Sequence, residues 1–511
     1  MNDRFAGIPV YKRFSPTPVS EASSLASVVI VGAGPVGLTL ALDLGQRGHH
    51  VKLLNRLDFI PGGSKAICFS KRSLDIWNRL GVGRRMVDKG VVWNLGKVFR
   101  GDGREPIFEF DLLPLKDQEM PAFINLQQYY AEEFLIDAVA EYPNIQLCWG
   151  HEVTDLKGQQ LTVLADDEEY SLSADWIIAA DGSRSTVRDL LGLDFSGRVF
   201  EDNFLIADVR FKDERPTERW FWFDPPWGGA SCLVHKQPDG VWRIDFQLGW
   251  DIDRTAEMQD DKVAERVRRA LGDDVDFEKE WYSIYTFQCR RMDRFVHDRV
   301  LFVGDSAHLV SPFGARGCNG GLADVDNLGW KLDAVLNGAD PALIETYNTE
   351  AVITADENIL NSTRSTDFMT PKSDLSQAFR DAVLDLAQDQ PFARPFVNSG
   401  RLSTPVSYPD GPLNTPDTDV WDGGVPPGSP AVDAPVEDGW LLPKLGGEWR
   451  LLSDRALPDA PLPAVTADSE LAQERYEIAG GGVYLIRPDQ YVAARWKTYS
   501  EDQLRASAWP G

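Results

Sequence analysis

The pattern of apolar and polar positions predicts two kinds of region in this chain. Residues 27–55 begin with a run of β-branched residues, pass through a glycine-rich turn, continue with apolar residues at helical spacing to Leu44, and end in a second apolar run. A strand, a helix and a second strand in that order predict a βαβ unit. Further helices are expected at 71–80 and 128–140, and further strands at 144–153 and 176–182.

From about residue 200 the pattern changes to short strand-like runs separated by turn residues. Successive runs of this kind are typical of an antiparallel sheet. Residues 254–271 have helical spacing, residues 281–288 form another strand-like run, and the chain then returns to an apolar run, a turn and a helical pattern at 301–332. We therefore expect a discontinuous α/β domain that is interrupted by a domain built on the sheet.

The C-terminal third begins with a long helical pattern at 343–369. A stretch rich in Pro and Asp follows at 404–437, and two strand-like runs come after it, at 447–454 and 481–496. This order favours a linker and a small third domain. The predicted division is an N-terminal surface arm (1–27), an α/β domain (28–200 and 290–370), a sheet domain (201–289), a helical linker (371–410) and a C-terminal domain (411–511).

Composition and charge narrow the class of protein. With 43% hydrophobic and 26% charged residues, the chain is typical of a soluble globular protein. The net charge of -27 disfavours nucleic acid and anionic membranes as partners. The five cysteines include no C-x-x-C pair, which indicates neither a metal site nor a disulfide framework. The first 27 residues lack the apolar core of a signal peptide, and no stretch is long enough for a membrane span, so we expect a cytoplasmic protein.

The turn of the βαβ unit carries the first chemical signal. It reads Gly32-x-Gly34-Pro35-x-Gly37, directly after a strand and before a helix. In a dinucleotide site the first glycine permits the tight turn, the second lets a pyrophosphate approach the backbone, and the third allows close helix–strand packing. Such glycines also serve ordinary turns, but their place in a βαβ unit favours dinucleotide binding. At the end of the second strand, where an acid usually binds a ribose hydroxyl, Asn55 offers an amide.

Two further strand ends carry a carboxylate beside a glycine. Asp181-Gly182 ends the apolar run WIIAA and is followed by Arg188. Gly304-Asp305 ends the run VLFV and precedes a turn rich in Pro and Gly that leads into the helical sequence NLGWKL. Each pair alone is usually just a turn. Together with the first glycine-rich turn they form a more specific pattern.

This order of motifs resembles the single-component (class A) FAD-dependent aromatic hydroxylases, over residues 28–370. Within that family it is most similar to the 3-(3-hydroxyphenyl)propionate hydroxylase and phenol 2-monooxygenase types. The resemblance implies a Rossmann-like FAD domain of the p-hydroxybenzoate hydroxylase kind, with an inserted substrate-binding sheet. It also implies hydroxylation of a phenolic ring with NADH or NADPH and O2, through a flavin C4a-hydroperoxide. The lack of a second G-x-G-x-x-G suggests that the nicotinamide docks transiently.

The resemblance also implies roles for individual residues. Asp305 would hold the ribityl chain, and Gly317, Cys318 and Asn319 would offer backbone to the flavin. Lys65 stands where the family usually has an arginine that contacts FAD or the nicotinamide, so the charge is kept and the planar fork is lost. The complete expected cofactor set is Gly32, Gly34, Pro35, Gly37, Asn55, Lys65, Gln128, Val153, Asp181, Arg188, Gly304, Asp305, Gly317, Cys318 and Asn319.

The substrate side is less well defined. Pro312 would lie beside the substrate ring, and the base that deprotonates the phenol is expected in the sheet domain, with His235, Arg243 and nearby tyrosines as open candidates. His308 is expected to brace its turn rather than transfer a proton. Cys318 has no activating base nearby and is treated as a backbone contact.

Two rival function classes remain, and each makes a different prediction. Trp220-x-Trp222 resembles the Trp-rich signature of flavin-dependent halogenases, although Asp224-Pro225 follows it here. Residues on one face of a strand are the favoured explanation. A third option is an aromatic pocket that some of Trp220, Trp222, Trp227 and Trp242 line. A non-catalytic flavin-binding protein is the second rival class.

The C-terminal part, with the sequence YLIRPDQYVAARW, resembles the thioredoxin-like tail of larger phenol hydroxylases. No cysteine occurs after Cys318, which excludes a thiol redox role there. Packing or contacts within a homodimer remain as its expected roles.

Overall fold

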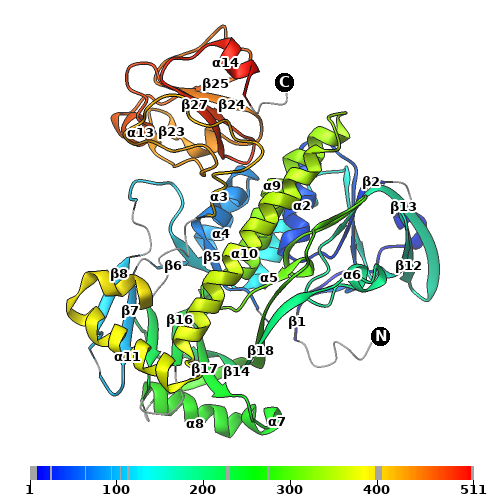
Figure 1. Ribbon diagram of the computed structural model, residues 1–511. Helices are drawn as coiled ribbons and strands as arrows, with labels where there is room; N and C mark the ends of the chain where they lie inside the picture. The colour runs from blue at the N-terminus through cyan, green and yellow to red at the C-terminus, as the bar shows by residue number, and fades with distance from the viewer. Residues whose placement is uncertain are drawn as a thin grey trace.

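The computed structural model of the chain describes residues 9–23, 26–63, 65–93, 95–103, 105–111, 115–225, 231–272, 275–397 and 405–507. The first eight residues of the expected arm and Trp227 lie outside them. Figure 1 shows the antiparallel sheet beside the α/β part, with the C-terminal part (orange to red) at one end. The long helix α10 (Leu343–Met369), as predicted, runs past both. In the described part of the chain, no helix combines the length and apolar character needed to cross a membrane.

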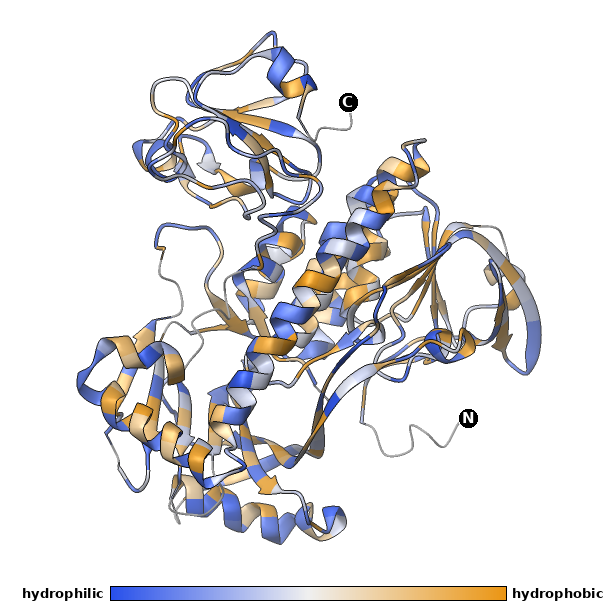
Figure 2. Ribbon diagram, in the orientation of Figure 1, coloured by the Kyte–Doolittle hydropathy of each residue, from blue (hydrophilic) through white to orange (hydrophobic). Residues whose placement is uncertain are grey.

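A parallel sheet forms the core of the α/β part. Its parallel strands run in the order β10-β3-β2-β13-β20, which places β2 between β3 and β13. Both faces of β2 are covered, and its Val28, Val29 and Ile30 are fully buried, so the strand is apolar throughout. In Figure 2 the inner part of this sheet is coloured mainly as hydrophobic, whereas the first half of β13 is rich in polar residues. The bounds are β2 Ala26–Val31, β3 Val51–Asn55, β10 Ile145–Trp149, β13 Glu168–Ala179 and β20 Val300–Phe302.

Helices cover this sheet where the sequence predicts them. Helix α2 (Pro35–Gln46) follows β2 and packs against α5 (Gln128–Val139) and α9 (Gly317–Leu336). The predicted βαβ unit is therefore confirmed. The predicted helix at 71–80 is α3 (Lys71–Arg79), which packs against α4 (Gly83–Lys89) and α9.

The prediction of one strand over 144–153 is wrong. Gly150 has a φ of 81°, in the left-handed region, and the turn that it makes ends β10. A new strand, β11 (Glu152–Lys157), then pairs with β12 (Gln160–Ala165), and β12 pairs with the first half of β13. The parallel sheet thus carries an antiparallel extension on the first half of β13.

The second sheet has the strand order β21-β18-β14-β17-β16-β15-β7-β8. Neighbours are antiparallel except β15 and β7. Strands β14 and β18 are longer than the apolar runs that predict them, because their ends continue into the α/β part. The segment that supplies β7 and β8 lies within the range expected for the α/β domain. The bounds are β7 Leu95–Arg100, β8 Phe108–Asp111, β14 Ser196–Phe211, β15 Arg219–Phe223, β16 Ser231–Lys236, β17 Val241–Gly249, β18 Phe277–Arg291 and β21 His308–Leu309.

The two faces of this sheet are covered by different elements. The predicted helix over 254–271 is two helices, α7 (Arg254–Glu257) and α8 (Asp260–Leu271), and α8 buries Val263 and Val267 in the apolar cluster on one face. The other face meets the α/β part and α11 (Asp374–Asp389), whose Leu384 joins a second apolar cluster there. A site between the sheet and the α/β part would therefore be enclosed.

The expected N-terminal arm is tied to the body of the protein. Its β1 (Val10–Arg13) pairs antiparallel with β4 (Phe59–Pro61), the strand that follows β3. A small sheet of β5 (Cys68–Ser70), β9 (Phe123–Asn125) and β6 (Val91–Val92) completes this side. The arm therefore buttresses the segment that leads from β3 to β5.

The C-terminal part is built on a sheet of order β25-β24-β26-β27. β24 and β25 are parallel, and the other neighbours are antiparallel. It joins the α/β part through buried ion pairs: Glu350 of α10 binds Arg487 at 2.6 Å and Lys331 of α9 at 2.7 Å. The bounds are β24 Arg450–Ser453, β25 Ala464–Thr466, α13 Glu470–Tyr476, β26 Val483–Ile486, β27 Val492–Trp496 and α14 Glu501–Arg505.

Candidate functional site

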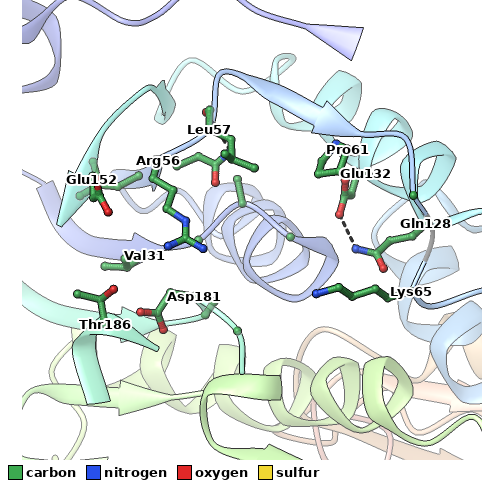
Figure 3. Close-up of a pocket in the computed structure, with 18 of the residues that line it drawn as sticks. Val31, Arg56, Leu57, Pro61, Lys65, Gln128, Glu132, Glu152, Asp181 and Thr186 are labelled. Atoms are coloured by element: carbon green, nitrogen blue, oxygen red, sulfur yellow. Dashed lines mark hydrogen bonds between the residues drawn. The ribbon is translucent and has the colours of Figure 1, made fainter. Parts of the chain in front are cut away.

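A cavity of about 480 Å³ lies where β2 and β3 end, between the parallel and the antiparallel sheet. Figure 3 shows side chains from the β3–β4 segment, α5 and the end of β13 around it. The residues of the expected cofactor set that line it are Gly32, Gly34, Asn55, Lys65, Gln128, Val153 and Asp181. Those outside its lining are Pro35, Gly37, Arg188, Gly304, Asp305, Gly317, Cys318 and Asn319.

The glycine-rich turn leaves backbone open to this cavity. Gly32 has a φ of 110°, and a Cβ there would lie 2.4 Å from the carbonyl oxygen of Ala180. A Cβ on Gly37 would lie 2.0 Å from the carbonyl oxygen of Gly32, so the third glycine allows the helix to approach the turn. A Cβ on Gly34 would meet no atom within 4 Å. The N-terminus of α2 is thus uncovered at Gly34, as an anion site requires.

Asp181 reaches the cavity with one oxygen unsatisfied. Its Oδ2 accepts a hydrogen bond from the backbone N–H of Val187 at 3.2 Å, and its Oδ1 is buried without a hydrogen-bond partner among the described residues. Burial raises the pKa of this carboxyl group. Arg188 points elsewhere and donates to the carbonyl oxygens of Ser306 and Ser183, at 3.0 Å each. Asp181 can receive a ligand donor, whereas Arg188 braces the two strand-end turns.

The second turn holds Asp305 on a rigid support. The N–H of Gly304 donates to Asp324 at 2.9 Å, and His308 Nε2 lies 2.7 Å from the same Asp324 oxygen. His308 therefore braces the turn, as expected. The side chain of Asp305 is open to solvent but lies in a recess. The surrounding protein raises the pKa of its carboxyl group, although the charges of His308 and Lys65 act to lower that pKa. Lys65 thus acts on Asp305 as well as lining the cavity.

The start of α9 is fixed to β5. Asn319 accepts a hydrogen bond from the N–H of Ser70 at 3.0 Å and donates to the carbonyl oxygen of Cys68 at 3.0 Å. Cys318 is half-buried, and burial raises the pKa of its thiol, so it is no nucleophile. Pro312 is exposed in the loop before α9, with Phe313 buried beside it. Their places are compatible with the expected roles, which remain predictions.

Comparisons with known proteins decide the family. The family model described as "FAD binding domain" matches residues 25–362. A 3-(3-hydroxy-phenyl)propionate/3-hydroxycinnamic acid hydroxylase of Burkholderia cenocepacia (strain HI2424) is 30% identical over 414 residues, which cover 77% of this chain and 73% of that relative. The chain belongs to the FAD-dependent aromatic hydroxylase family. FAD is the cofactor of this flavoprotein.

Two further similarities extend over the C-terminal part of the flavoprotein. Pentachlorophenol 4-monooxygenase of Sphingobium chlorophenolicum is 26% identical over 524 residues, which cover 93% of this chain and 94% of that protein. A crystal structure of aklavinone-11 hydroxylase with FAD and aklavinone has a TM-score of 0.78 at 19% identity, over 94% of this chain and 97% of that one. At that identity the likeness shows a shared fold.

The cavity fits the cofactor. Gly34 leaves room for a pyrophosphate at the start of α2, and Asp181 has an unsatisfied buried oxygen for a hydroxyl donor. The flavoprotein also places Arg56 there, whose guanidinium extends into the cavity in Figure 3. Sequence reasoning missed Arg56 because it considered only the strand's last residue, Asn55, whose amide donates to the carbonyl oxygen of Leu57 at 3.2 Å.

The antiparallel sheet contributes three cavity residues, Trp281, Ser283 and Tyr285. Sequence reasoning missed the first two, and it left Tyr285 among the unnamed tyrosines of the sheet domain. The three residues alternate along β18 and share one face. Burial raises the pKa of Tyr285 to about 12, so its hydroxyl stays protonated and can donate. Their spacing at every second residue indicates in the sequence that they share one face of a strand. Only the register of the folded sheet shows which face meets the cofactor.

The two expected catalytic side chains of the sheet lie in one row across its strands. Arg219, His235, Arg243 and Asp208 are direct cross-strand neighbours. Arg243 binds both oxygens of Asp208, at 2.8 and 2.7 Å, so its charge is neutralised. His235 is buried beside Cys68, and Arg219 Nη1 lies 3.4 Å from the Cys68 sulfur. Neither side chain lines the cavity.

The tryptophan pair of β15 packs away from the cofactor side. Trp220 and Trp222 join the apolar cluster under α8, and Trp222 stacks on Phe99 at 4.8 Å between ring centroids. Trp242 belongs to the same cluster. These three side chains have a packing role, and no group of three or more potential metal ligands occurs among the described residues of the flavoprotein.

Proposed function

We propose that this flavoprotein hydroxylates a phenolic substrate, with NADH or NADPH as reductant and O2 as oxidant. The shape of the cavity carries the proposal. Its lining combines Gly32 and Gly34 of the dinucleotide turn with Trp281, Ser283 and Tyr285 of the antiparallel sheet. A cofactor bound along it would extend from the dinucleotide turn to the sheet. The names of two relatives, a hydroxyphenylpropionate hydroxylase and a pentachlorophenol monooxygenase, support a substituted phenol as substrate.

The chain's own residues would bind and orient the cofactor. The open N-terminus of α2 at Gly34, with Arg56 and Lys65, would hold the pyrophosphate and neighbouring negative charge. Asp181 and Asp305 would accept hydrogen bonds from hydroxyl groups. When bound, FAD would accept electrons from NAD(P)H and pass them to O2, which supplies the oxygen atom for the ring.

An aromatic cluster would hold the substrate ring beside Pro312. Phe313 packs edge-to-face against Phe204 and Phe287 of the sheet, at 5.0 and 5.5 Å between centroids. Leu384 of α11 covers the same cluster. Such apolar walls exclude water from the oxygen transfer and fix the orientation of the ring.

The proton of the phenol would pass to Asp245. Its Oδ2 lies 3.6 Å from His235 Nε2, and its side chain is 19% exposed where that of His235 is 3% exposed. Asp245 is thus the more accessible of the two side chains. Burial alone would lower the pKa of His235, but Asp245 and Cys68 together raise it. We propose that Asp245 takes the proton and that His235 positions the carboxylate and stabilises its charge.

A panel of phenols tests this function. We expect phenols that fit the cavity to stimulate NAD(P)H oxidation and oxygen uptake by the purified flavoprotein and to gain 16 mass units, about one oxygen atom. Asp245→Asn should lower product formation about 100-fold. The exposed Asp251→Asn is the control and should behave as wild type. Stimulation by no phenol, or a product that requires halide, would contradict the proposal.

We further propose a thioredoxin-like arrangement for residues 411–511. The strand order β25-β24-β26-β27, with one parallel pair, supports it. The segment between β24 and β25 contains no helix, which differs from a thioredoxin-like arrangement. The ion pairs of Arg487 support a packing role for the region. The domain boundaries, the homodimer and the cytoplasmic location given above remain predictions.

A further inference from the structure

Glu132 is a buried carboxyl group of the cofactor cavity that the proposed reaction does not use. It lies on α5, one turn after Gln128, and only 6% of the residue is exposed. Its Oε1 accepts a hydrogen bond from Gln128 Nε2 at 2.8 Å, and Gln128 Oε1 accepts one from the N–H of Ala66 at 3.1 Å. Figure 3 shows Glu132 and Gln128 together at the end of the cavity where Lys65 enters it.

The groups that face Glu132 stabilise the ionised form of its carboxyl group only weakly. Lys65, from the segment after β4, is the facing cation, and it makes no ion pair with Glu132 among the described residues. The Cys318 thiol of α9 also faces it, and the same thiol is close enough to Asp305 to sense its charge. Gln128 donates as a neutral amide. Burial therefore prevails and raises the pKa of Glu132 to about 7.

The second oxygen of the carboxyl group is available to a ligand. Glu132 Oε2 makes no hydrogen bond to the described residues, while Oε1 is held by Gln128. A protonated Glu132 can donate one hydrogen bond from Oε2, and an ionised Glu132 would add a negative charge to a cavity that must accept a pyrophosphate. FAD should therefore bind better to the protonated form.

We propose that Glu132 is a cofactor-binding residue that acts as a neutral acid: it donates a hydrogen bond to an oxygen of FAD, so that binding takes up a proton from solvent. The group is ionised above its pKa in the free protein and protonated in the complex. By linkage, FAD affinity falls as pH rises through the pKa of the free protein. This inference depends on FAD binding and is independent of the proposed hydroxylation.

Equilibrium binding of FAD to the cofactor-free chain, measured by flavin fluorescence, tests this proposal. For the wild type we expect the dissociation constant to be nearly constant below pH 6.5 and to rise about tenfold per pH unit above about pH 7.5. Glu132→Gln keeps the shape and the donor but cannot ionise, so its affinity should not change with pH between 6 and 8.5. Glu152→Gln, another carboxyl group that lines the cavity, is the matched control and should keep the wild-type slope.

Proton uptake gives a second readout that needs no variant. On adding FAD to the wild type in weak buffer at pH 7.5, we expect roughly 0.8 proton to be taken up per FAD bound, from a group with a pKa near 7. No uptake, or a wild-type affinity that does not change with pH, would overturn the proposal. A slope that persists in Glu132→Gln would overturn it too, because another group would then carry the proton.

Discussion

Two clusters of buried charge differ in how their polar atoms are satisfied. At the junction with the C-terminal part, Glu350, Arg487 and Lys331 are fully buried, and both cations bind Glu350, at 2.6 to 2.8 Å. In the cofactor cavity, Asp181 has a buried oxygen without a partner, and Glu132 has one neutral donor. Burying a carboxylate is costly in both places. At the junction, protein cations offset that cost. In the cofactor cavity, the carboxyl groups stay available to a ligand.

The pKa values show the same difference. Although burial alone would raise the pKa of Glu350, Arg487 and Lys331 hold it well below its usual range. Burial raises the pKa of Glu132 to about 7, because no cation is bonded to it. The paired cluster should therefore govern stability, and the unpaired one should govern cofactor affinity.

The largest effect is expected at the junction. Arg487→Met removes the bidentate partner of Glu350 and should cost about 3–5 kcal/mol in the free energy of unfolding, because an uncompensated charge remains buried. Chemical denaturation of the FAD-loaded chain measures it. Because the folded pKa of Glu350 is depressed, its contribution is present above about pH 4.5 and lost as pH falls toward the folded value. A variant as stable as the wild type would show that the pairing contributes nothing.

Next in size is the effect of a side chain at Gly34. Gly34→Val meets no protein atom near its Cβ, so the folded chain should keep its melting temperature without cofactor. The added methyl groups would occupy the space for the pyrophosphate and weaken FAD binding about 100-fold, or ~2.7 kcal/mol. Flavin fluorescence measures the affinity. Unchanged affinity would place the cofactor elsewhere.

Sequence patterns predicted the helices, strands and turns that depend only on neighbouring residues in the chain. The βαβ turn and α10 follow from glycine spacing and helical periodicity within one segment. The error at 144–153 has a local cause that periodicity does not show, the left-handed turn at Gly150. The cavity-facing side of β18 depends on partners far along the chain, so Tyr285 could not be singled out among the tyrosines of the sheet domain. His235 was named for its residue type, and only the structure shows that its side chain is more deeply buried than that of its neighbour Asp245.

The smallest effect is expected for the cation that sequence reasoning missed. Arg56→Ala should weaken FAD binding about threefold to tenfold, and the loss should shrink at high salt because the attraction is screened. The exposed Arg84, which pairs with Glu119 away from the cavity, gives the control Arg84→Ala. Equal effects of the two substitutions would mean that net charge matters and the position of Arg56 does not.

Isotope incorporation tests most directly whether the cavity serves oxygen transfer to a phenol. The purified flavoprotein, with FAD, NAD(P)H and a phenol that stimulates its oxidation, is incubated under ¹⁸O2 and the product is analysed by mass spectrometry. We expect one ¹⁸O atom in the new hydroxyl group. A product without the label, or NAD(P)H oxidation that yields only peroxide with every phenol tried, would contradict the proposed function.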